Sequence, residues 1–334
     1  MNKFISSLAA VLFSMAASAA TTKTYTVAVV YDGTKATVTI PSEISSYVNC
    51  LSGESSHVKL IQTSTTLANP GEIIYSLKGS SDNGEFYFVG EYKATLKLDG
   101  LTLANPDSSA VHIKDGKRIK VSITDKTVNT LSDGVADTTS KGCFHCKGHT
   151  EFAGKGTLNV SSAFNHAIYS KEYVEVKNCT LNITGAKKDG IHCQQYFLMS
   201  SGELNISGVE DDGIQVELKD TIQTGTTKDH EDENSGNFYM TGGTLTISDV
   251  GSYCLKTVGT IQYSGTGKQN FDTTNVLEHS DNPSAINAIA NDPSDNRTYY
   301  YDLHGRRIAK EAMLPRGIYI VKEGGKTKKV IHSR

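Results

Sequence analysis

A short sequence pattern recurs four times in the middle of the chain and constrains the fold more than any other feature. Each copy carries a leucine at its third position: Leu158, Leu181, Leu204 and Leu245. The first two intervals are 23 residues long and the third is 41, which equals 23 plus an 18-residue insertion. Short alternating runs bounded by glycine at such a period predict strands that stack as coils of a parallel β-helix.

A second pattern keeps the same period and defines which side chains face the interior. Its apolar column is expected to point inward: Val111, Phe144, Ile168, Ile191, Ile214 and Cys254. Side chains alternate along a strand, so His112, His145, Tyr169, His192 and Gln215 should face outward. The two patterns together predict about six turns between residues 91 and 263.

The N-terminus has the features of a secretory signal peptide at residues 1–19. Asn2 and Lys3 precede an apolar run at residues 4–13, and small residues follow at 17–20. No later segment offers the roughly 20 apolar residues that a membrane-spanning helix needs. The sequence therefore predicts an exported chain without a transmembrane segment in its mature form.

The overall charge excludes some classes of partner. The formal net charge is only −3 at pH 7. Nucleic acid and anionic membrane surfaces are bound by proteins with a basic excess, so neither is expected as a partner.

The regions outside the solenoid also read as β structure. Residues 20–90 are predicted to form an N-terminal β cap, because the open edge of a first coil must be covered. A polar linker is expected at residues 264–298, followed by a small antiparallel β module at residues 299–334.

Six cysteines in an exported chain raise the question of disulfides or a zinc site. Cys146 and Cys193 are expected two coils apart, beyond disulfide reach. The segment Cys143-Phe144-His145-Cys146, with His149 beyond it, resembles a zinc site, but in a strand the two cysteines would face opposite sides. Buried free thiols are the favoured interpretation, with zinc as the alternative.

The C-terminal module resembles a known secretion signal. Its pattern is Tyr-Asp-Leu-x-Gly-Arg-Arg from Tyr301, then Gly-Ile-Tyr-Ile-Val from Gly317 and Lys-Lys-Val-Ile from Lys328. This resembles the sorting domain of the type IX, or Por, secretion system of Bacteroidota. The resemblance implies contact with that secretion machinery and a location outside the cell or on its surface. If the module is not a working signal, a periplasmic location is expected.

The repeat region carries a resemblance of its own at residues 72–257. It rests on segments such as residues 74–79, 94–101, 125–134 and 154–158, and on Asp189-Gly190-Ile191. Their order is similar to the bacterial carbohydrate-binding β-helix family whose members bind polygalacturonate and calcium. The resemblance implies a right-handed parallel β-helix, in line with the handedness of parallel crossovers. It also implies that residues 91–263 bind an acidic polysaccharide.

Three aspartates are candidate calcium ligands. Asp189 and Asp212 are 23 residues apart and should occupy the same place on adjacent coils, with Asp211 beside them. Carboxylates one coil spacing apart can converge on calcium, which accepts six to eight oxygens. The alternative is that aspartate before glycine only stabilises a turn. The acidic run at residues 229–234 is a second possible location.

An outward cationic column is the candidate carbohydrate site. Lys114, Lys147 and Lys171 form one column beside the outward rings, and the residues expected to bind the sugar are Lys147, Lys171, Tyr169 and His192. Lysines can pair with uronate carboxylates, and a tyrosine ring offers a flat amphipathic surface for a sugar. The alternative is an ordinary solvated face of the solenoid.

Three function classes remain open at this level. The first is a noncatalytic protein that binds an acidic polysaccharide such as polygalacturonate with the help of calcium. The second is a β-helix polysaccharide lyase, in which calcium acidifies the uronate and a basic residue abstracts its proton. The third is a structural or adhesive surface protein. The repeat region contains a single arginine, Arg118, that could serve as the basic residue of a lyase. This scarcity favours the noncatalytic class.

Overall fold

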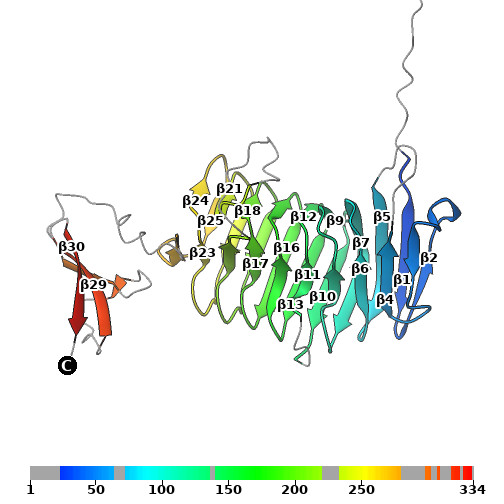
Figure 1. Ribbon diagram of the computed structural model, residues 1–334, viewed down its shortest axis with the longest axis horizontal. Coiled ribbons are helices and arrows are strands. Elements are labelled where there is room, and N and C mark those ends of the chain that lie inside the picture. Colours follow the sequence, from blue (N-terminus) through cyan, green and yellow to red (C-terminus); the bar gives the residue numbers. More distant parts are fainter. Residues whose placement is uncertain are drawn as a thin grey trace, which may run out of the picture.

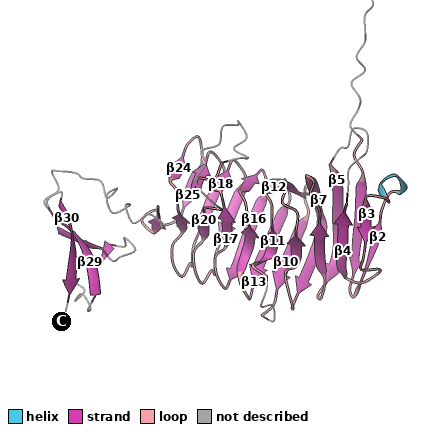
Figure 2. Cartoon of the chain, viewed as in Figure 1, coloured by secondary structure: helices cyan, strands magenta, loops and turns pink. Residues whose placement is uncertain are grey.

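The computed structural model describes residues 23–63, 72–135, 140–219, 233–279, 298–301, 307–308, 317–323 and 326–332. These residues are almost entirely β (Figure 2), with one short 3-10 helix, η1 (Ser42–Ile44). The expected signal peptide and residues 229–232 of the acidic run lie outside the described residues. None of the helices in the described ranges is long and apolar enough to cross a membrane.

The strands stack along one axis in chain order (Figure 1). They form three faces, A, B and C, within which neighbouring strands of the coils run parallel. Face A contains β9 (Ile119–Ile123), β12 (Thr150–Gly154), β15 (Val174–Lys177), β18 (Tyr196–Met199), β21 (Asn237–Met240) and β24 (Ile261–Tyr263). Face B contains β10 (Val128–Asp133), β13 (Thr157–Ser162), β16 (Thr180–Ala186), β19 (Glu203–Ile206), β22 (Thr244–Ile247) and β25 (Lys268–Asn270). The long strands β5 (Ile73–Ser81) and β7 (Ala94–Asn105) bend between these two faces and join them.

Face C is a separate sheet of ten strands and carries the candidate site. It contains β3 (Val48–Cys50), β4 (His57–Gln62), β6 (Glu85–Val89), β8 (Val111–Ile113), β11 (Gly142–Cys146), β14 (His166–Ser170), β17 (Ile191–Gln194), β20 (Ile214–Glu217), β23 (Leu255–Thr257) and β26 (Val276–Leu277). Apart from the first pair, neighbouring strands of this face run parallel.

The expected parallel β-helix is confirmed, with about eight turns. Leu158, Leu181, Leu204 and Leu245 are successive partners in the register of face B. The stack extends beyond residues 91–263, because β1 (Thr26–Asp32) already pairs in parallel with β5. At the other end β25 and β26 continue it. The hairpin strand β2 (Lys35–Thr39) and β3 pair in antiparallel fashion at the N-terminal end.

One expected register is wrong by a single residue. Ile214 pairs with Leu255 and not with Cys254. The expected register would have turned Lys256 toward the core beside Val216, because a one-residue slip moves every side chain to the other face. The observed register keeps Lys256 outside, as the partner of Gln215.

The interior is a continuous column of apolar side chains. Val111, Phe144, Ile168, Ile191 and Ile214 are fully buried. Fully burying a side chain of this size contributes roughly 1.5 to 3 kcal/mol relative to exposure. Each coil adds its own layer, so the apolar core holds the stack together along its whole length.

Glycine at two corners of face C is required by the close approach of adjacent coils. A Cβ at Gly190 would lie 2.7 Å from the carbonyl oxygen of Gly213, and a Cβ at Gly213 would lie 2.6 Å from that of Cys254. Real Cβ atoms do not approach an oxygen so closely. The glycine of the Asp-Gly-Ile pattern is therefore required by the packing of adjacent coils as well as by the turn.

An asparagine ladder links three coils on the outside of face B. Asn182 Nδ2 donates to Asn159 Oδ1 at 2.8 Å, and Asn205 Nδ2 donates to Asn182 Oδ1 at 2.9 Å. All three side chains are half-buried, so these bonds are partly shielded from water. The central residue takes part in both bonds.

We expect Asn182→Ala to lower the free energy of unfolding by about 1 to 3 kcal/mol, since each hydrogen bond contributes about 0.5 to 1.5 kcal/mol net. Asn205→Ala removes one of the two bonds and should cause about half the loss. Urea unfolding of both variants measures the difference. Equal midpoints for the two variants would contradict the ladder.

All six cysteines are free, as the favoured interpretation required. Cys143, Cys146, Cys179, Cys193 and Cys254 are buried, and Cys50 is half-buried. Burial raises the pKa of Cys146 to about 12 and that of Cys179 to about 11. Since the thiolate is the reactive form, the buried thiols should be inert in the folded protein.

We expect one thiol, that of Cys50, to react rapidly with a chromogenic disulfide reagent at pH 8. The other five should react only when the protein unfolds. A Cys50→Ser variant should lose the rapid phase and keep the slow one. A second rapid thiol in the native protein would contradict the buried assignment.

The C-terminal module is a small antiparallel sheet, as expected. It contains β27 (Thr298–Tyr301), β28 (Arg307–Ile308), β29 (Gly317–Glu323) and β30 (Lys326–His332). β29 lies between β27 and β30 and pairs with both. Tyr319, Ile320 and Val321 of β29 are buried.

Candidate functional site

A ladder of aromatic rings runs along the outside of face C. We call it the ring ladder; its members are successive register partners: Tyr87, His112, His145, Tyr169 and His192. Their ring centroids are separated in turn by 5.1, 4.4, 5.1 and 5.3 Å. The alternation of the strands thus places one ring per coil on the outer side, as the sequence predicted.

Accessibility changes along the ring ladder. Tyr87, His112 and His145 are half-buried, whereas Tyr169 and His192 are only 4% and 8% exposed. Lys141 covers the Tyr169 ring, with its Nζ 4.9 Å from the ring centroid. His192 lies between two carboxylates. The two rings singled out from sequence therefore offer little surface, and the accessible part of the ladder is the N-terminal half.

A column of exposed lysines follows face C beside the ladder. Lys114, Lys147 and Lys171 are all exposed. Backbone bonds fix their spacing: Lys147 N donates to Ile113 O, and Lys171 N donates to Cys146 O, both at 2.9 Å. Lys114 also approaches the ladder, with its Nζ 5.5 Å from the centroid of Tyr87. The column therefore places cations next to accessible rings.

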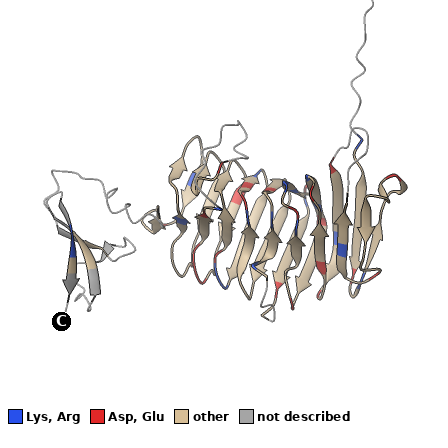
Figure 3. Ribbon diagram, in the orientation of Figure 1, with Lys and Arg blue, Asp and Glu red and all other residues tan. Residues whose placement is uncertain are grey.

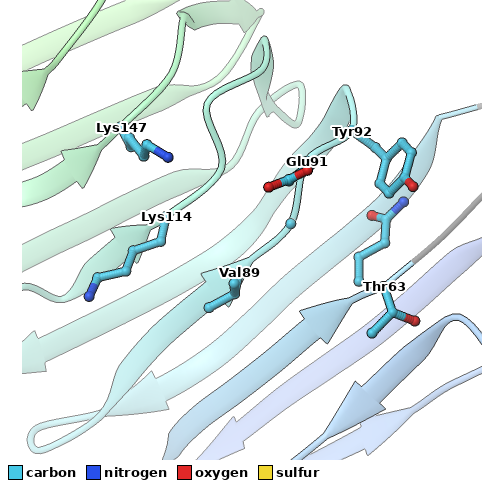
Figure 4. Close-up of a pocket in the computed structure, with 8 residues that line it drawn as sticks. Thr63, Val89, Glu91, Tyr92, Lys114 and Lys147 are labelled. Atoms are coloured by element: carbon cyan, nitrogen blue, oxygen red, sulfur yellow. The ribbon is translucent and has the colours of Figure 1, made fainter.

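A depression of about 510 Å³ lies at the N-terminal end of this column. It is lined by Gln62, Thr63, Val89, Gly90, Glu91, Tyr92, Lys114 and Lys147. Figure 4 shows the two lysines on one side and Tyr92 and Thr63 on the other, with Glu91 between them. Lys171 is not part of this lining. The structure thus brings Lys114 and Lys147 of the predicted column together with Thr63, Glu91 and Tyr92, which the sequence did not indicate.

Tyr92 was missed because it lies in the bend after β6, outside the recurring pattern. Its backbone N–H donates to Asp115 Oδ2 at 3.1 Å, and Asp115 Oδ1 accepts the N–H of Lys117 at 2.8 Å. Asp115 is fully buried, and burial raises the pKa of its carboxyl. This aspartate holds two neighbouring bends in place beneath the depression.

The three candidate calcium ligands do come together. One carboxylate oxygen from each of Asp189, Asp211 and Asp212 lies within 4.8 Å of the others. Asp189 and Asp212 are buried and Asp211 is half-buried. The 23-residue spacing therefore located the cluster correctly.

Internal partners already engage two of these carboxylates. Asp189 Oδ2 lies 3.1 Å from His166 Nδ1 and 2.9 Å from His192 Nδ1, and its Oδ1 accepts the N–H of Asp212 at 3.2 Å. Asp212 Oδ1 accepts the N–H of Tyr253 at 3.0 Å, and its Oδ2 lies 3.1 Å from Lys256 Nζ. Each of the two aspartates accepts a backbone N–H from the next coil, so each also holds the next turn in place.

The charges of this cluster shift its pKa values. Burial alone would raise the pKa of Asp189, but His166 and His192 hold it well below its usual range. Burial would lower the pKa of His192, yet the bonds with Asp189 and Glu217 raise it to about 9. Burial and the two neighbouring aspartates raise the pKa of Asp211. Negative charge is therefore least compensated at Asp211.

Arg118 is not placed to act as a catalytic base. Its guanidinium pairs with Glu72 and lies 3.7 Å from Glu151, and its side chain is 13% exposed.

Basic and acidic residues are interspersed along the described solenoid (Figure 3), so no large field of one sign forms there.

The base of the long insertion is tied to the solenoid. Lys219 pairs with Glu172 and donates its backbone N–H to Asn234 Oδ1 at 3.0 Å. Glu233, the first described residue after the gap at 220–232, is buried and accepts from Tyr239 Oη at 2.6 Å. Glu233 and Asn234 therefore serve as anchors of the coil.

Three comparisons with known proteins agree with this architecture. A solved chain described as a polysaccharide lyase-like protein from C. thermocellum shares the fold, with a TM-score of 0.54 and 19% identity over 75% of this chain and 98% of that one. A relative from Acetivibrio thermocellus, described as a carbohydrate-binding domain-containing protein, is 27% identical over 111 residues. That match spans 30% of this chain and 38% of the relative.

The family comparison covers the solenoid itself. The model of the carbohydrate-binding domain-containing protein family matches residues 62–294. This range contains the ring ladder, the lysine column and the aspartate cluster. The chain therefore belongs to the family of carbohydrate-binding domain-containing proteins.

Proposed function

We propose that the protein is an exported, noncatalytic protein that binds an acidic polysaccharide, such as polygalacturonate, along the N-terminal half of face C. The observation that carries this proposal is the depression lined by Lys114, Lys147 and Tyr92 beside the accessible rings of the ladder. Lysines supply the charge that a uronate carboxylate needs, and aromatic faces pack against the apolar face of a sugar ring.

The shape of the surface suits a polymer. Rings and lysines of face C recur once per coil, at about 4.8 Å between neighbouring strands. A chain lying along this face would therefore meet the same kind of contact repeatedly. In this proposal Tyr169 and His192 are buried members of the ring ladder that pack beside its accessible rings. Lys171 extends the cationic column beyond the depression.

Export would proceed through the signal peptide, and the C-terminal sheet would engage the type IX secretion machinery. The motivation is the sequence pattern of residues 299–334 together with the antiparallel sheet that they form. The proposed location is extracellular or on the cell surface, with the periplasm as the alternative.

A lyase is the second candidate function, because the similar solved chain is described as polysaccharide lyase-like. A lyase needs a basic group that is free to abstract a proton. Arg118 is held by Glu72 and Glu151, so a lysine would have to take this role. A structural or adhesive role remains as the third candidate.

Calcium at Asp189, Asp211 and Asp212 remains a proposal. Three converging carboxylates favour a cation there. The pKa of Asp211 is raised in part by the negative charges of its two neighbours, and a cation would compensate these charges. Against it, Lys256 already pairs with Asp212, and both oxygens of Asp189 have partners. Calcium would therefore have to displace Lys256 from Asp212.

We expect the double change Lys114→Ala and Lys147→Ala to weaken binding to polygalacturonate roughly two- to thirtyfold. Each exposed charge pair contributes about 0.2 to 1 kcal/mol, and 1.4 kcal/mol is a tenfold change in Kd. The loss should shrink as salt rises, because screening already weakens the wild-type contacts. Affinity electrophoresis in polygalacturonate gels at two salt concentrations measures this.

The matched control is the double change Lys120→Ala and Lys177→Ala, which removes two exposed lysines from face A. It alters the net charge equally and should leave retention close to that of the wild type. Greater loss in the control would place the site on face A. Release of unsaturated product, followed by its ultraviolet absorbance, would favour the lyase instead.

For calcium, we expect a higher melting temperature in calcium than in chelator, since an ion that binds the folded state alone stabilises it. At 100 times the dissociation constant the gain is about 2.7 kcal/mol. Lys256→Met should enlarge the calcium response by removing a competitor, and Asp211→Asn should reduce it. Identical melting temperatures in calcium and chelator would exclude the site.

A further inference from the structure

Two histidines and one aspartate from adjacent coils converge beside the aspartate cluster. His166 Nδ1 and His192 Nδ1 lie 3.1 and 2.9 Å from the same atom, Asp189 Oδ2. Ligand atoms around a tetrahedral zinc ion at about 2.0 to 2.2 Å lie roughly 3.3 to 3.6 Å from one another. All three atoms of this cluster lie within 4.8 Å of one another, so small side-chain adjustments would place them around one small divalent cation.

His166 Nδ1 has two polar neighbours. The backbone N–H of Asp189 lies 3.2 Å away and donates to this nitrogen when it carries no proton. Asp189 Oδ2 lies 3.1 Å away and accepts from the nitrogen when it is protonated. A divalent cation between Nδ1 and Oδ2 would take the place of that proton.

The surrounding groups orient the other two side chains. His192 Nε2 lies 3.3 Å from Glu217 Oε2, so the ring can direct Nδ1 toward the cluster while its other nitrogen donates to a carboxylate. Asp189 Oδ1 accepts the N–H of Asp212, which leaves Oδ2 to the histidines. Metal-binding histidines characteristically have such a carboxylate partner on the second nitrogen.

We propose that His166 Nδ1, His192 Nδ1 and Asp189 Oδ2 bind one divalent transition-metal ion of the zinc class. Imidazole nitrogen selects zinc, copper or nickel, whereas calcium and magnesium take oxygen ligands. His166 and His192 are each 8% exposed, which leaves a small opening for water or another ligand. His192 also belongs to the ring ladder, but none of the three ligands lines the depression proposed for carbohydrate.

The bound ion would connect two coils of the solenoid. His166 begins β14, whereas Asp189 and His192 belong to the next coil, which carries β17. The folded state would then be stabilised by binding, because an unfolded chain does not hold the three ligands together.

The test is isothermal titration of the purified full chain, without a histidine tag, with zinc chloride. We expect one ion per chain and a higher melting temperature at saturation. Cobalt chloride should give a visible absorption band that zinc removes. In the Asp211→Asn variant, which removes a ligand from the proposed calcium site and keeps all three of these, tenfold excess calcium should leave the band unchanged, since calcium avoids nitrogen ligands. Loss of the band in calcium, or no zinc binding, would overturn the proposal.

His166→Gln should abolish the binding, and His149→Gln is the matched control. His149 also pairs with a carboxylate, with its Nε2 2.6 Å from Glu172, but belongs to no cluster of three metal-ligating groups among the described residues. Circular dichroism without metal checks the fold of both variants. Equal loss in both would overturn the assignment.

If His166→Gln does not fold, Glu217→Gln provides a second test. It leaves the three ligands in place and removes the carboxylate partner of His192. Changes at such partners typically lower metal affinity ten- to hundredfold. We expect a loss in this range, and an unchanged affinity would contradict the proposed orientation of His192.

Discussion

Every feature of this solenoid depends on parallel backbone hydrogen bonding between coils that keeps one register along each face. The apolar core tolerates no slip, because a shift of one residue would turn the buried column outward. Residues 23 positions apart in the regular coils therefore lie directly above one another. This constraint converts a repeat in sequence into columns of like side chains, such as the asparagine ladder and the ring ladder.

The same stacking explains why outward residues need not be accessible. A ring on the outer side of a parallel sheet has a neighbour about 4.8 Å away on each side. Tyr169 packs between His145 and His192 and beneath Lys141, so little of it reaches solvent. His145 also lies between two rings, His112 and Tyr169, yet it remains half-buried. The side chains that cover a ring, as well as its direction, decide which residues can meet a ligand.

Sequence reasoning located most of the fold because the period and the alternation depend on local pattern alone. It assigned Cys254 to the wrong register, although the 41-residue interval between Leu204 and Leu245, applied to Ile214, gives Leu255. It missed Tyr92, which lies in a bend, and His166, whose partner Asp189 belongs to the next coil. His166 lies one 23-residue period before Asp189, but it carries a different side chain from the aspartates of that column. A repeat reveals columns of like side chains, whereas a bend or an unlike residue at a repeat position gives no such signal.

Asp189 shows how one residue can belong to two different chemical environments. Its Oδ1 faces the coil above and accepts a backbone N–H, while its Oδ2 faces two imidazoles. Asp212 repeats the first contact but has Lys256 where Asp189 has the histidines. A buried carboxylate needs a compensating cation, and neighbouring coils supply different ones. The turn geometry of the Asp-Gly-Ile pattern is therefore shared between coils, whereas the chemistry at each aspartate is set by the side chains stacked beside it.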